Sequence, residues 1–316
     1  MSDHVLAQII AWPPAGRYIV AVSGGVDSVC LLDLLVAQVS ARHYELVVAH
    51  ADHALRPDSA RDQELVRQAA RRYDLPFATT TLQLPNASEA TARAARYGFL
   101  RRVMAEHQAR AIITAHTLDD QLETLVFAAL RTQSGRGLLG IQPGEDLVRP
   151  LLGVSKNQLL DYAREQQLGW HDDSTNAETT YARNAIRHHV LPAITQHNPR
   201  FAQTAQALAG QLALTRQQLT QAITTWLATN AEQTPTCLQL GRRAVLAQES
   251  PVVAEIIAQA CYQRFPGIEL TAERLHEAAR FAKTARSGRV ELGQGLSLTV
   301  TSGFITLSIA RPPQNR

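Results

Sequence analysis

Several groups of polar residues in this 316-residue chain have types and spacing suited to chemistry on a phosphate. The first is Ser23-Gly24-Gly25-Val26-Asp27-Ser28, a turn of small residues that directly follows an apolar run. Glycines let the backbone approach a ligand closely, and N–H groups and hydroxyls at a helix start form a receptor for anionic oxygens. No Lys follows these glycines, and the three spaced glycines of a dinucleotide-binding loop are missing. A βα turn without a ligand is the alternative interpretation.

The second group is acidic and lies at the start of a predicted helix. Asp119 or Asp120, together with Glu123, faces away from the apolar stripe of that helix. Two carboxylates three or four residues apart can help hold Mg²⁺ together with nucleotide phosphates. The alternative is that the acids only stabilise the helix N-terminus, which explains Asp119 better than it explains Glu123.

The third group is basic. Arg93, Arg96 and Tyr97 share one face of a predicted helix, which is either a patch beside a phosphate site or a solvated face. Arg136 belongs to a glycine-punctuated segment that is either a lid over phosphates or a surface loop. Arg183 and Arg187 are four residues apart, so both can reach one ligand; a surface helix is the alternative.

Histidines follow two predicted strands. His50 ends one of them, and the residues after it include Asp52, His53 and Arg56; His116 ends another. Polar residues at the C-terminal end of a parallel strand lie where ligands bind in doubly wound sheets. Spacing alone leaves open whether the first cluster binds a metal or is ordinary turn chemistry.

The elements that must position these groups alternate between strand and helix. Predicted strands cover 18–22, 45–50, 77–82 and 111–116, and predicted helices begin at 28, 59, 88, 118 and 156. This order predicts an α/β fold with a doubly wound, mainly parallel sheet in a catalytic domain over 1–195. A helical linker is predicted over 196–230. A smaller α+β domain over 231–316 follows, with an antiparallel ending of three strands from 289 onward.

Composition narrows the class of protein. The chain is 45% hydrophobic and 19% charged, with a net charge of +3, so a nucleic-acid partner is permitted without being required. Cys30, Cys237 and Cys261 form no closely spaced pair, which disfavours a disulfide scaffold, structural zinc and thiol-based sulfur transfer and fits a reducing cytoplasm. The sequence contains no run of about 18 apolar residues, so we expect no membrane span.

Taken together, the motifs resemble one branch of the PP-loop ATP pyrophosphatases, which have an adenine nucleotide alpha hydrolase-like fold. The branch is that of the short-type tRNA(Ile)-lysidine synthetases. The residues that carry the resemblance are Ser23 to Ser28, His50 to Arg56, Ala92-Arg93-x-x-Arg96-Tyr97, Thr114-Ala115-His116 to Glu123-Thr124, Arg149-Pro150-Leu151, and Asp173-x-x-Asn176 to Arg183-Asn184-x-x-Arg187.

The resemblance implies ATP-dependent ligation of free lysine to the 2-position of the wobble cytidine in the CAU anticodon of tRNA(Ile). The cytidine is first adenylated, and pyrophosphate and AMP are released. It implies catalytic roles for Asp27, Asp120, His116 and Arg187, and ATP binding by Ser23, Gly24, Gly25, Val26, Asp27, Ser28 and His50. It implies substrate binding by Arg93, Arg96, Tyr97, Glu123, Arg136, Asn176 and Arg183, Mg²⁺ binding by Asp27 and Asp120, and tRNA binding by the accessory domain over 231–316.

The chain departs from the family pattern at Thr117, where a second His is frequent, and at Thr132 and Ser134, which replace glycines of the lid. Two other functions stay open. One is another PP-loop enzyme, such as a tRNA thiolase or an amidotransferase-linked synthetase. The other is a non-catalytic RNA-binding module. The oligomeric state is also open, with a homodimer among the options.

Overall fold

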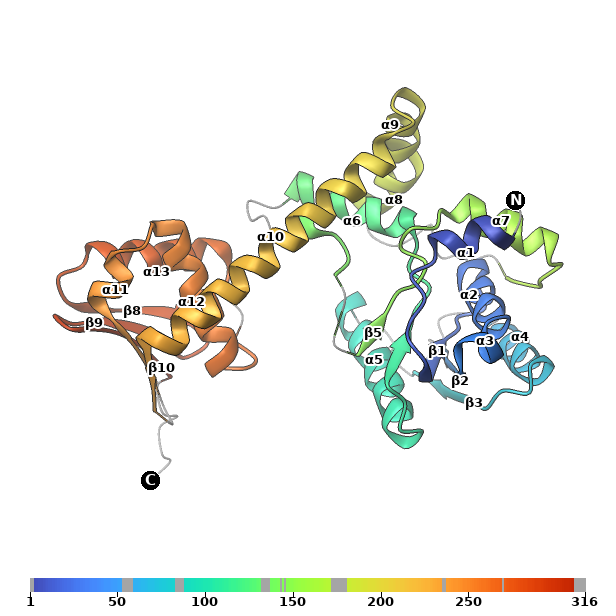
Figure 1. Cartoon of the computed structure of the whole chain (residues 1–316), viewed down its shortest axis with the longest axis horizontal. Coiled ribbons are helices and arrows are strands. Elements are labelled where there is room, and N and C mark those ends of the chain that lie inside the picture. Colours follow the sequence, from blue (N-terminus) through green and yellow to red (C-terminus); the bar gives the residue numbers. More distant parts are fainter. Residues whose placement is uncertain are drawn as a thin grey trace. The chain divides into compact units, whose positions relative to one another are not determined.

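Two compact units make up the described part of the chain (Figure 1), and the boundary between them falls inside a long helix, between Leu208 and Ala209. The sequence places its helical linker at 196–230, a range that includes this boundary. Within the described residues, no helix is both long and apolar enough to cross a membrane. The computed structural model describes residues 3–52, 59–82, 88–131, 137–142, 144, 146–171, 181–234, 237–268 and 270–309.

The first unit is built on a five-stranded sheet with the strand order β3-β2-β1-β4-β5. Every neighbouring pair is parallel, and β1 pairs with both β2 and β4 through Ile19. This confirms the predicted parallel α/β fold. The strands are β1 (Gly16–Ala21), β2 (Tyr44–Asp52), β3 (Phe77–Thr81), β4 (Ala111–Ile113) and β5 (Leu147–Val148).

Helices cover both faces of this sheet, because alternate strand residues point to opposite sides. Val20 and Val48 pack with α2, α4 and α7, whereas Ile19 and Val47 pack with α5. The helices of the unit are α1 (Asp3–Ile9), α2 (Val26–Val36), α3 (Val39–Arg42), α4 (Ser59–Arg72), α5 (Glu89–Glu106), α6 (Leu118–Arg131), α7 (Lys156–Glu165), α8 (Tyr181–Ala185) and α9 (Leu191–His197), with a 3-10 turn at Gly137–Leu139 and a π-helical turn at Ile186–Val190.

The order of strands reverses between β1 and β4. Moving outward from β1, the chain proceeds to β2 and β3 on one side and to β4 and β5 on the other. In sheets of this type, ligands bind in the crevice outside the C-terminal ends of the strands, at the point where the order reverses. The residues after β1 and β4 therefore share one edge of the sheet.

Helices α2 and α7 run side by side in the same direction. The Cys30 thiol donates to the Leu159 carbonyl at 3.3 Å, and three residues further along both helices Tyr162 donates its hydroxyl to Asp33 at 2.5 Å. Tyr73 at the end of α4 donates a hydroxyl to the same carboxylate. Two tyrosines thus satisfy the Asp33 carboxylate and fix three helices on one face of the sheet.

The second unit has its own core around a five-stranded antiparallel sheet of order β6-β7-β10-β9-β8. The sequence predicted the last three strands but not the first two, so the prediction of three strands is incomplete. The elements are α10 (Phe201–Asn230), which begins in the first unit, β6 (Ala231–Gln233), β7 (Cys237–Gly241), α11 (Arg242–Leu246), α12 (Ser250–Arg264), α13 (Ala272–Thr284), β8 (Gly288–Gly293), β9 (Leu296–Val300) and β10 (Phe304–Ile309).

We predict that Tyr73→Phe lowers the free energy of unfolding by about 1 to 2 kcal/mol, because a hydrogen bond to the Asp33 carboxylate is lost while the ring remains. Urea unfolding followed by circular dichroism measures the change. Tyr262→Phe is the matched control, since Tyr262 is 75% exposed and should change stability by less than about 0.5 kcal/mol. Equal stability of both variants and the parent would contradict a stabilising role for this contact.

Candidate active site

The loop after β1 closes around the hydroxyl of Ser28. This oxygen accepts from the backbone N–H groups of Ser23 at 3.1 Å and Gly24 at 3.3 Å, and it donates to the Gly25 carbonyl at 2.9 Å. Gly24 has a φ of +97°, a conformation that disfavours any residue with a Cβ. Ser28 therefore holds the loop in shape, and it is only 5% exposed.

Helix α2 begins directly after this loop, and no side chain caps its N-terminus. The N–H groups of Val26 and Asp27 in its first turn have no hydrogen-bond acceptor within the described residues. Free N–H groups at a helix start, together with the helix dipole, favour an anion. The receptor for anionic oxygens that the sequence predicts here stays a prediction, and these N–H groups are the donors that it would use.

Two distant segments support the loop at Gly24. The backbone N–H of His171 donates to the Gly24 carbonyl at 3.0 Å, and the imidazole Nδ1 of His171 lies 2.7 Å from the Asp62 carboxylate on α4. A Cβ added at Gly24 would lie 3.5 Å from the Cβ of Asp62. Neither His171 nor Asp62 belongs to a recognisable motif, so the sequence gives no signal for this contact.

Asp27 carries a carboxylate oxygen that is buried and has no partner among the described residues. Burial raises the pKa of Asp27 to about 6, and the charges of Asp120 and Asp119 add to this effect. Lys156 and Arg187 act in the opposite direction and lower the pKa. Asp27 is therefore a carboxylate at the edge of the sheet that is available to a ligand.

His116 lies just beyond β4 and stays neutral near pH 7. Its Nδ1 lies 2.9 Å from the Thr114 hydroxyl. Burial is the main cause that lowers the pKa of His116 to about 4. The Asp120 carboxylate opposes this effect, and the guanidinium groups of Arg149, Arg93 and Arg96 add to it. Two of the arginines predicted to bind substrate thus contribute positive charge at the same place.

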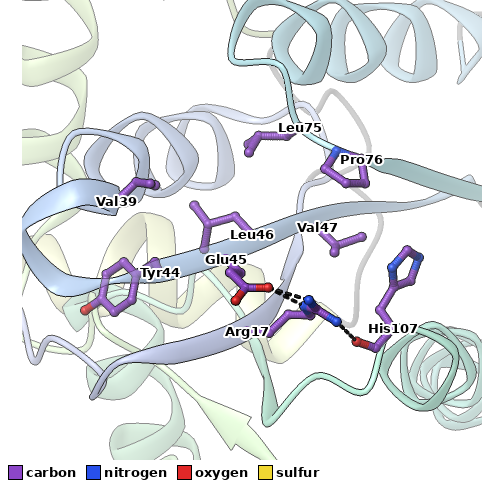
Figure 2. Close-up of a pocket in the computed structure, with 9 residues that line it drawn as sticks. All are labelled: Arg17, Val39, Tyr44, Glu45, Leu46, Val47, Leu75, Pro76 and His107. Atoms are coloured by element: carbon purple, nitrogen blue, oxygen red, sulfur yellow. Dashed lines mark hydrogen bonds and ion pairs between the residues drawn. The ribbon is translucent and has the colours of Figure 1, made fainter.

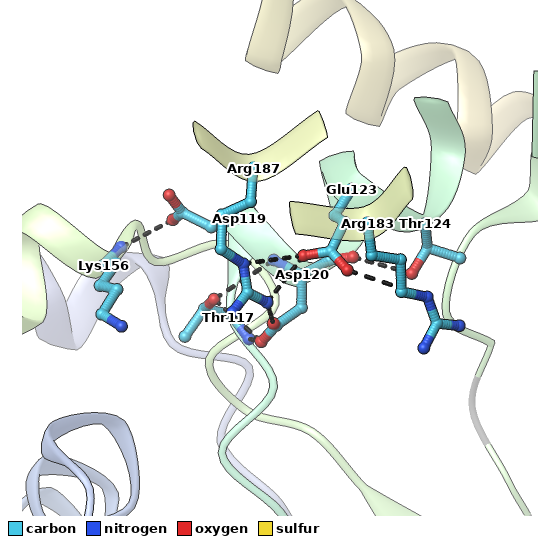
Figure 3. Close-up of polar contacts among 8 residues, drawn as sticks. All are labelled: Thr117, Asp119, Asp120, Glu123, Thr124, Lys156, Arg183 and Arg187. Atoms are coloured by element: carbon cyan, nitrogen blue, oxygen red, sulfur yellow. Dashed lines mark hydrogen bonds and ion pairs between the residues drawn. The ribbon is translucent and has the colours of Figure 1, made fainter. Parts of the chain in front are cut away.

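Hydrogen bonds hold the carboxylates of Asp119 and Asp120 at the start of α6. Thr117 and Asp120 form a reciprocal cap, in which the Asp120 carboxylate accepts from the Thr117 N–H at 2.9 Å and from its hydroxyl at 3.1 Å. Thr117, a departure from the family pattern, is 1% exposed and therefore has a structural position here. Asp119 accepts from the backbone N–H of Lys156 at 2.7 Å and so ties the start of α6 to the start of α7 (Figure 3).

Arg187 joins the acids that the sequence assigned to catalysis and substrate binding (Figure 3). Its Nη2 lies 2.7 Å from Glu123 and 3.3 Å from Asp120, and Arg183 lies 3.9 Å from the other oxygen of Glu123. Glu123 is 8% exposed, so an unpaired charge there would be costly. The structure therefore brings the predicted acids and the predicted arginine pair together, and the arginines form ion pairs with the carboxylates.

Tyr97 is the centre of the predicted basic face. The guanidinium carbons of Arg93 and Arg96 lie 5.0 and 5.5 Å from the centroid of its ring, and that of Arg101 lies at 5.9 Å. The Tyr97 hydroxyl is buried and has no partner among the described residues. Because buried polar groups are nearly always hydrogen-bonded, this hydroxyl points to a ligand or a water molecule.

His50 presents a second unpartnered atom of this kind. Its Nδ1 lies 2.8 Å from the carbonyl of Val22, and a carbonyl can only accept, so Nδ1 carries the proton. In the neutral imidazole the opposite nitrogen, Nε2, is an acceptor; it is buried and has no partner among the described residues. His50 lies next to the loop that follows β1, as its predicted role in ATP binding requires.

Some residues of the predicted site are not among those that the structure describes. Arg136 and Asn176 lie outside the described residues, as do His53, Arg56, Thr132 and Ser134. Conversely, Lys156 joins the site although the sequence analysis assigned it no role. The rarity of lysine could have drawn attention to this residue, because Lys156 and Lys283 are the two lysines of the chain.

A cavity of about 360 Å³ lies at the other end of the strands (Figure 2). Apolar residues such as Leu46 and Pro76 form much of its wall. Its guanidinium, that of Arg17, is already bound by Glu45 at 2.7 Å and by the His107 carbonyl at 2.9 Å. Because the cavity is at the N-terminal edge of the sheet, we do not assign it to the predicted chemistry.

The chain has relatives of known name. It is 39% identical over 199 residues to a tRNA(Ile)-lysidine synthase of Gloeobacter violaceus, covering 61% of this chain and 61% of that protein. It is 39% identical over 216 residues to a tRNA(Ile)-lysidine synthase of Geobacter sulfurreducens, covering 64% of this chain and 46% of that protein. The chain thus matches less than two thirds of either relative.

A solved structure also shares the fold. The U34-tRNA thiolase NcsA from Methanococcus maripaludis, with its [4Fe-4S] cluster, aligns with a TM-score of 0.56 at 12% identity over 66% of this chain and 77% of that one. At this identity the likeness concerns the fold alone. The family model described as a PP-loop domain matches residues 2–194. Because this match covers more than half of the chain, the protein belongs to the PP-loop domain family.

Proposed function

We propose that this protein uses ATP to ligate free lysine to the 2-position of the wobble cytidine of tRNA(Ile) with a CAU anticodon. The observation that carries the proposal is the juxtaposition of the uncapped α2 N-terminus and the unpartnered Asp27 carboxylate with His116, Asp120 and Arg187. The relatives named tRNA(Ile)-lysidine synthase support the choice of substrate. We place the reaction in the cytoplasm.

ATP binds at the loop from Ser23 to Ser28. The N–H groups of Val26 and Asp27 and the α2 dipole attract its phosphates, and the free His50 Nε2 accepts a hydrogen bond from the nucleotide. The Asp27 carboxylate fits Mg²⁺, which is usually held by one or two carboxylates together with phosphates and which would neutralise charge on the polyphosphate. Asp120 fits less well, because Arg187 and the helix cap engage its oxygens.

The 2-position carbonyl oxygen of the cytidine attacks the α-phosphorus, and pyrophosphate leaves. Negative charge develops on the departing group, and preorganised cations close to it lower the barrier. Arg93 and Arg96 contribute a positive field that already acts on His116. A wobble base that is unstacked from its loop can enter such a site, as in other single-strand RNA recognition.

The amine of lysine then attacks the adenylated cytidine at the same carbon, and AMP leaves. Glu123 and Asp120 are the acidic residues proposed to face the lysine ammonium, and their contacts with Arg187 fix their orientation. The neutral His116 does not repel that ammonium. The attacking amine must lose a proton, so an acidic residue or a histidine close to it is needed as the base.

Sulfur transfer, the alternative left open by the sequence, gains no support from the cysteines. Cys30 lies in the core of the first unit, and burial raises the pKa of its thiol to about 12, so it is not nucleophilic at neutral pH. Cys237 and Cys261 belong to the second unit. We propose that this unit instead binds the tRNA.

We predict that AMP release from ATP requires both lysine and tRNA(Ile) with a CAU anticodon. Arginine in place of lysine should give less than about one hundredth of the rate, because a guanidinium replaces the attacking amine. We expect an equally low rate with tRNA(Met) in place of tRNA(Ile), because the second unit is proposed to bind the rest of the tRNA. Thin-layer chromatography of labelled AMP measures the rate, and mass spectrometry of the tRNA identifies the product. Equal AMP release with either substitute would overturn the assignment.

We predict that Asp27→Asn removes turnover and raises the stability of the free protein. The native pKa of about 6 lies above the unfolded value near 3.9, so the native state holds the proton more tightly and stability falls as pH rises through about 6. A neutral Asn avoids this loss, and we expect a gain of about 1 to 2 kcal/mol at pH 8 that shrinks toward pH 4.

Urea unfolding at pH 4, 6 and 8 and the AMP assay measure the two effects. Asp161→Asn is the matched control, because Asp161 is an exposed acid that lies 3.6 Å from Arg164. It should change neither stability nor turnover appreciably. Full activity of Asp27→Asn would show that Asp27 is not part of the site. If the difference in unfolding free energy between the variant and the parent did not change with pH, Asp27 would not be a buried group with a raised pKa.

A further inference from the structure

We propose that Lys156 is a nucleotide-binding residue whose ammonium contacts the phosphates of ATP at the loop from Ser23 to Ser28. This inference rests on the proposed binding of ATP at that loop. The common P-loop carries its lysine directly after the glycines, whereas this loop has none. The fold supplies a lysine from another helix, about 130 residues further along the chain.

The register of α2 against α7 places Lys156 beside the loop. Cys30 contacts Leu159, and Asp33 contacts Tyr162, so a step of three residues along α2 matches a step of three along α7. One step back toward both N-termini, Asp27 is level with Lys156. Asp27 is in the first turn of α2, and Lys156 is the first residue of α7.

A second contact fixes the position of Lys156. Its backbone N–H donates to the Asp119 carboxylate at 2.7 Å, and Asp119 is in the first turn of α6, just after β4. Figure 3 shows the Lys156 side chain extending away from this contact. The backbone is thus held by the acid, while the ammonium remains available to another group.

The ammonium of Lys156 has no hydrogen-bond or ion-pair partner among the described residues, although the side chain is only half-exposed. Its charge is close enough to lower the pKa of Asp27 without forming an ion pair with it. The buried Asp27 oxygen is also without a partner. An unpaired cation and an unpaired carboxylate at the mouth of one loop fit a polyphosphate, with the cation on its oxygens.

The chemistry of the neighbourhood favours the same ligand. The N-termini of α2 and α7 lie side by side, and the dipole of each helix adds positive potential there. The cap of α7 is complete, because Ser155 and Gln158 form a capping box, so Lys156 is not needed to stabilise the helix start. A flexible ammonium suits charge that moves from the α-phosphate to a departing pyrophosphate.

Lysine labelling tests this directly, because Lys156 and Lys283 are the two lysines of the chain. The full-length protein is acetylated at low reagent concentration with and without saturating α,β-methylene-ATP and Mg²⁺, and peptide mass spectrometry reads each lysine. Lys283 is an internal reference: it is half-exposed, belongs to the second unit and donates to the Gln248 carbonyl at 2.6 Å. Adenosine, which lacks phosphates, is the matched ligand control.

We expect the nucleotide to slow acetylation of Lys156 at least fivefold, with no change at Lys283 and no effect of adenosine. Equilibrium dialysis of the nucleotide accompanies the labelling. Bound nucleotide with unchanged labelling of Lys156 overturns this inference alone and leaves the proposed function standing. Absence of nucleotide binding overturns the proposed function, and this inference with it.

Substitution provides an independent measurement. Lys156→Gln should weaken binding of α,β-methylene-ATP at least tenfold, and Lys156→Arg should retain most of the affinity, because the positive charge is kept. Neither should change the affinity for adenosine, and circular dichroism should show both variants folded. Equal weakening by both substitutions, or an equal loss of adenosine binding, would mean that Lys156 shapes the site without touching the phosphates.

Discussion

Parallel pairing of β1 with both β2 and β4 is the constraint on which the candidate site depends. Parallel neighbours cannot be joined by a tight turn, so each strand is followed by a crossover that contains a helix. With the strand order reversing at β1 and β4, the segments that follow these two strands meet at one edge of the sheet. The loop from Ser23 to Ser28 and the acids at the start of α6 become neighbours in this way, although about 90 residues separate them.

Pairing of charge leaves one carboxylate at this edge of the sheet without a partner among the described residues. Glu123 and Asp120 could each attract a cation, but Arg187 contacts both, and Asp120 also caps its own helix. Asp119 is bound to the backbone of Lys156. Asp27 is left with a buried oxygen that no described residue satisfies, and burial holds its pKa at about 6. Removing a carboxylate from water without a partner costs stability, and the free energy of ligand binding can offset this cost.

The fold predicted from the sequence agrees with the structure where periodicity is strong. The loop, its flanking strand and helix, and the cap of α5 by Ser88 all carry local signals. Strand β7 was missed although Leu238 and Leu240 alternate with polar residues and are fully buried. The segment is five residues long and follows a long helix, so its alternation was too short to stand out. The hydrophobic periodicity of the sequence places Leu130 on the apolar stripe of α6, but its side chain is 70% exposed close to the end of that helix.

For the site, the sequence by itself determined the loop, the acids of α6 and the arginine pairs, because each is a pattern within one helical turn or one strand end. The tertiary structure alone decided which of these side chains are engaged and which are free. His171, which is bound to Asp62, donates to the carbonyl of Gly24. Arg187 forms an ion pair with Glu123, and Lys156 lies level with Asp27. These contacts join residues about 60 to 150 positions apart, and they depend on how segments distant in the sequence pack against one another. Periodicity along one helix reveals its buried face but not its register against a neighbour, so only the folded chain could fix them.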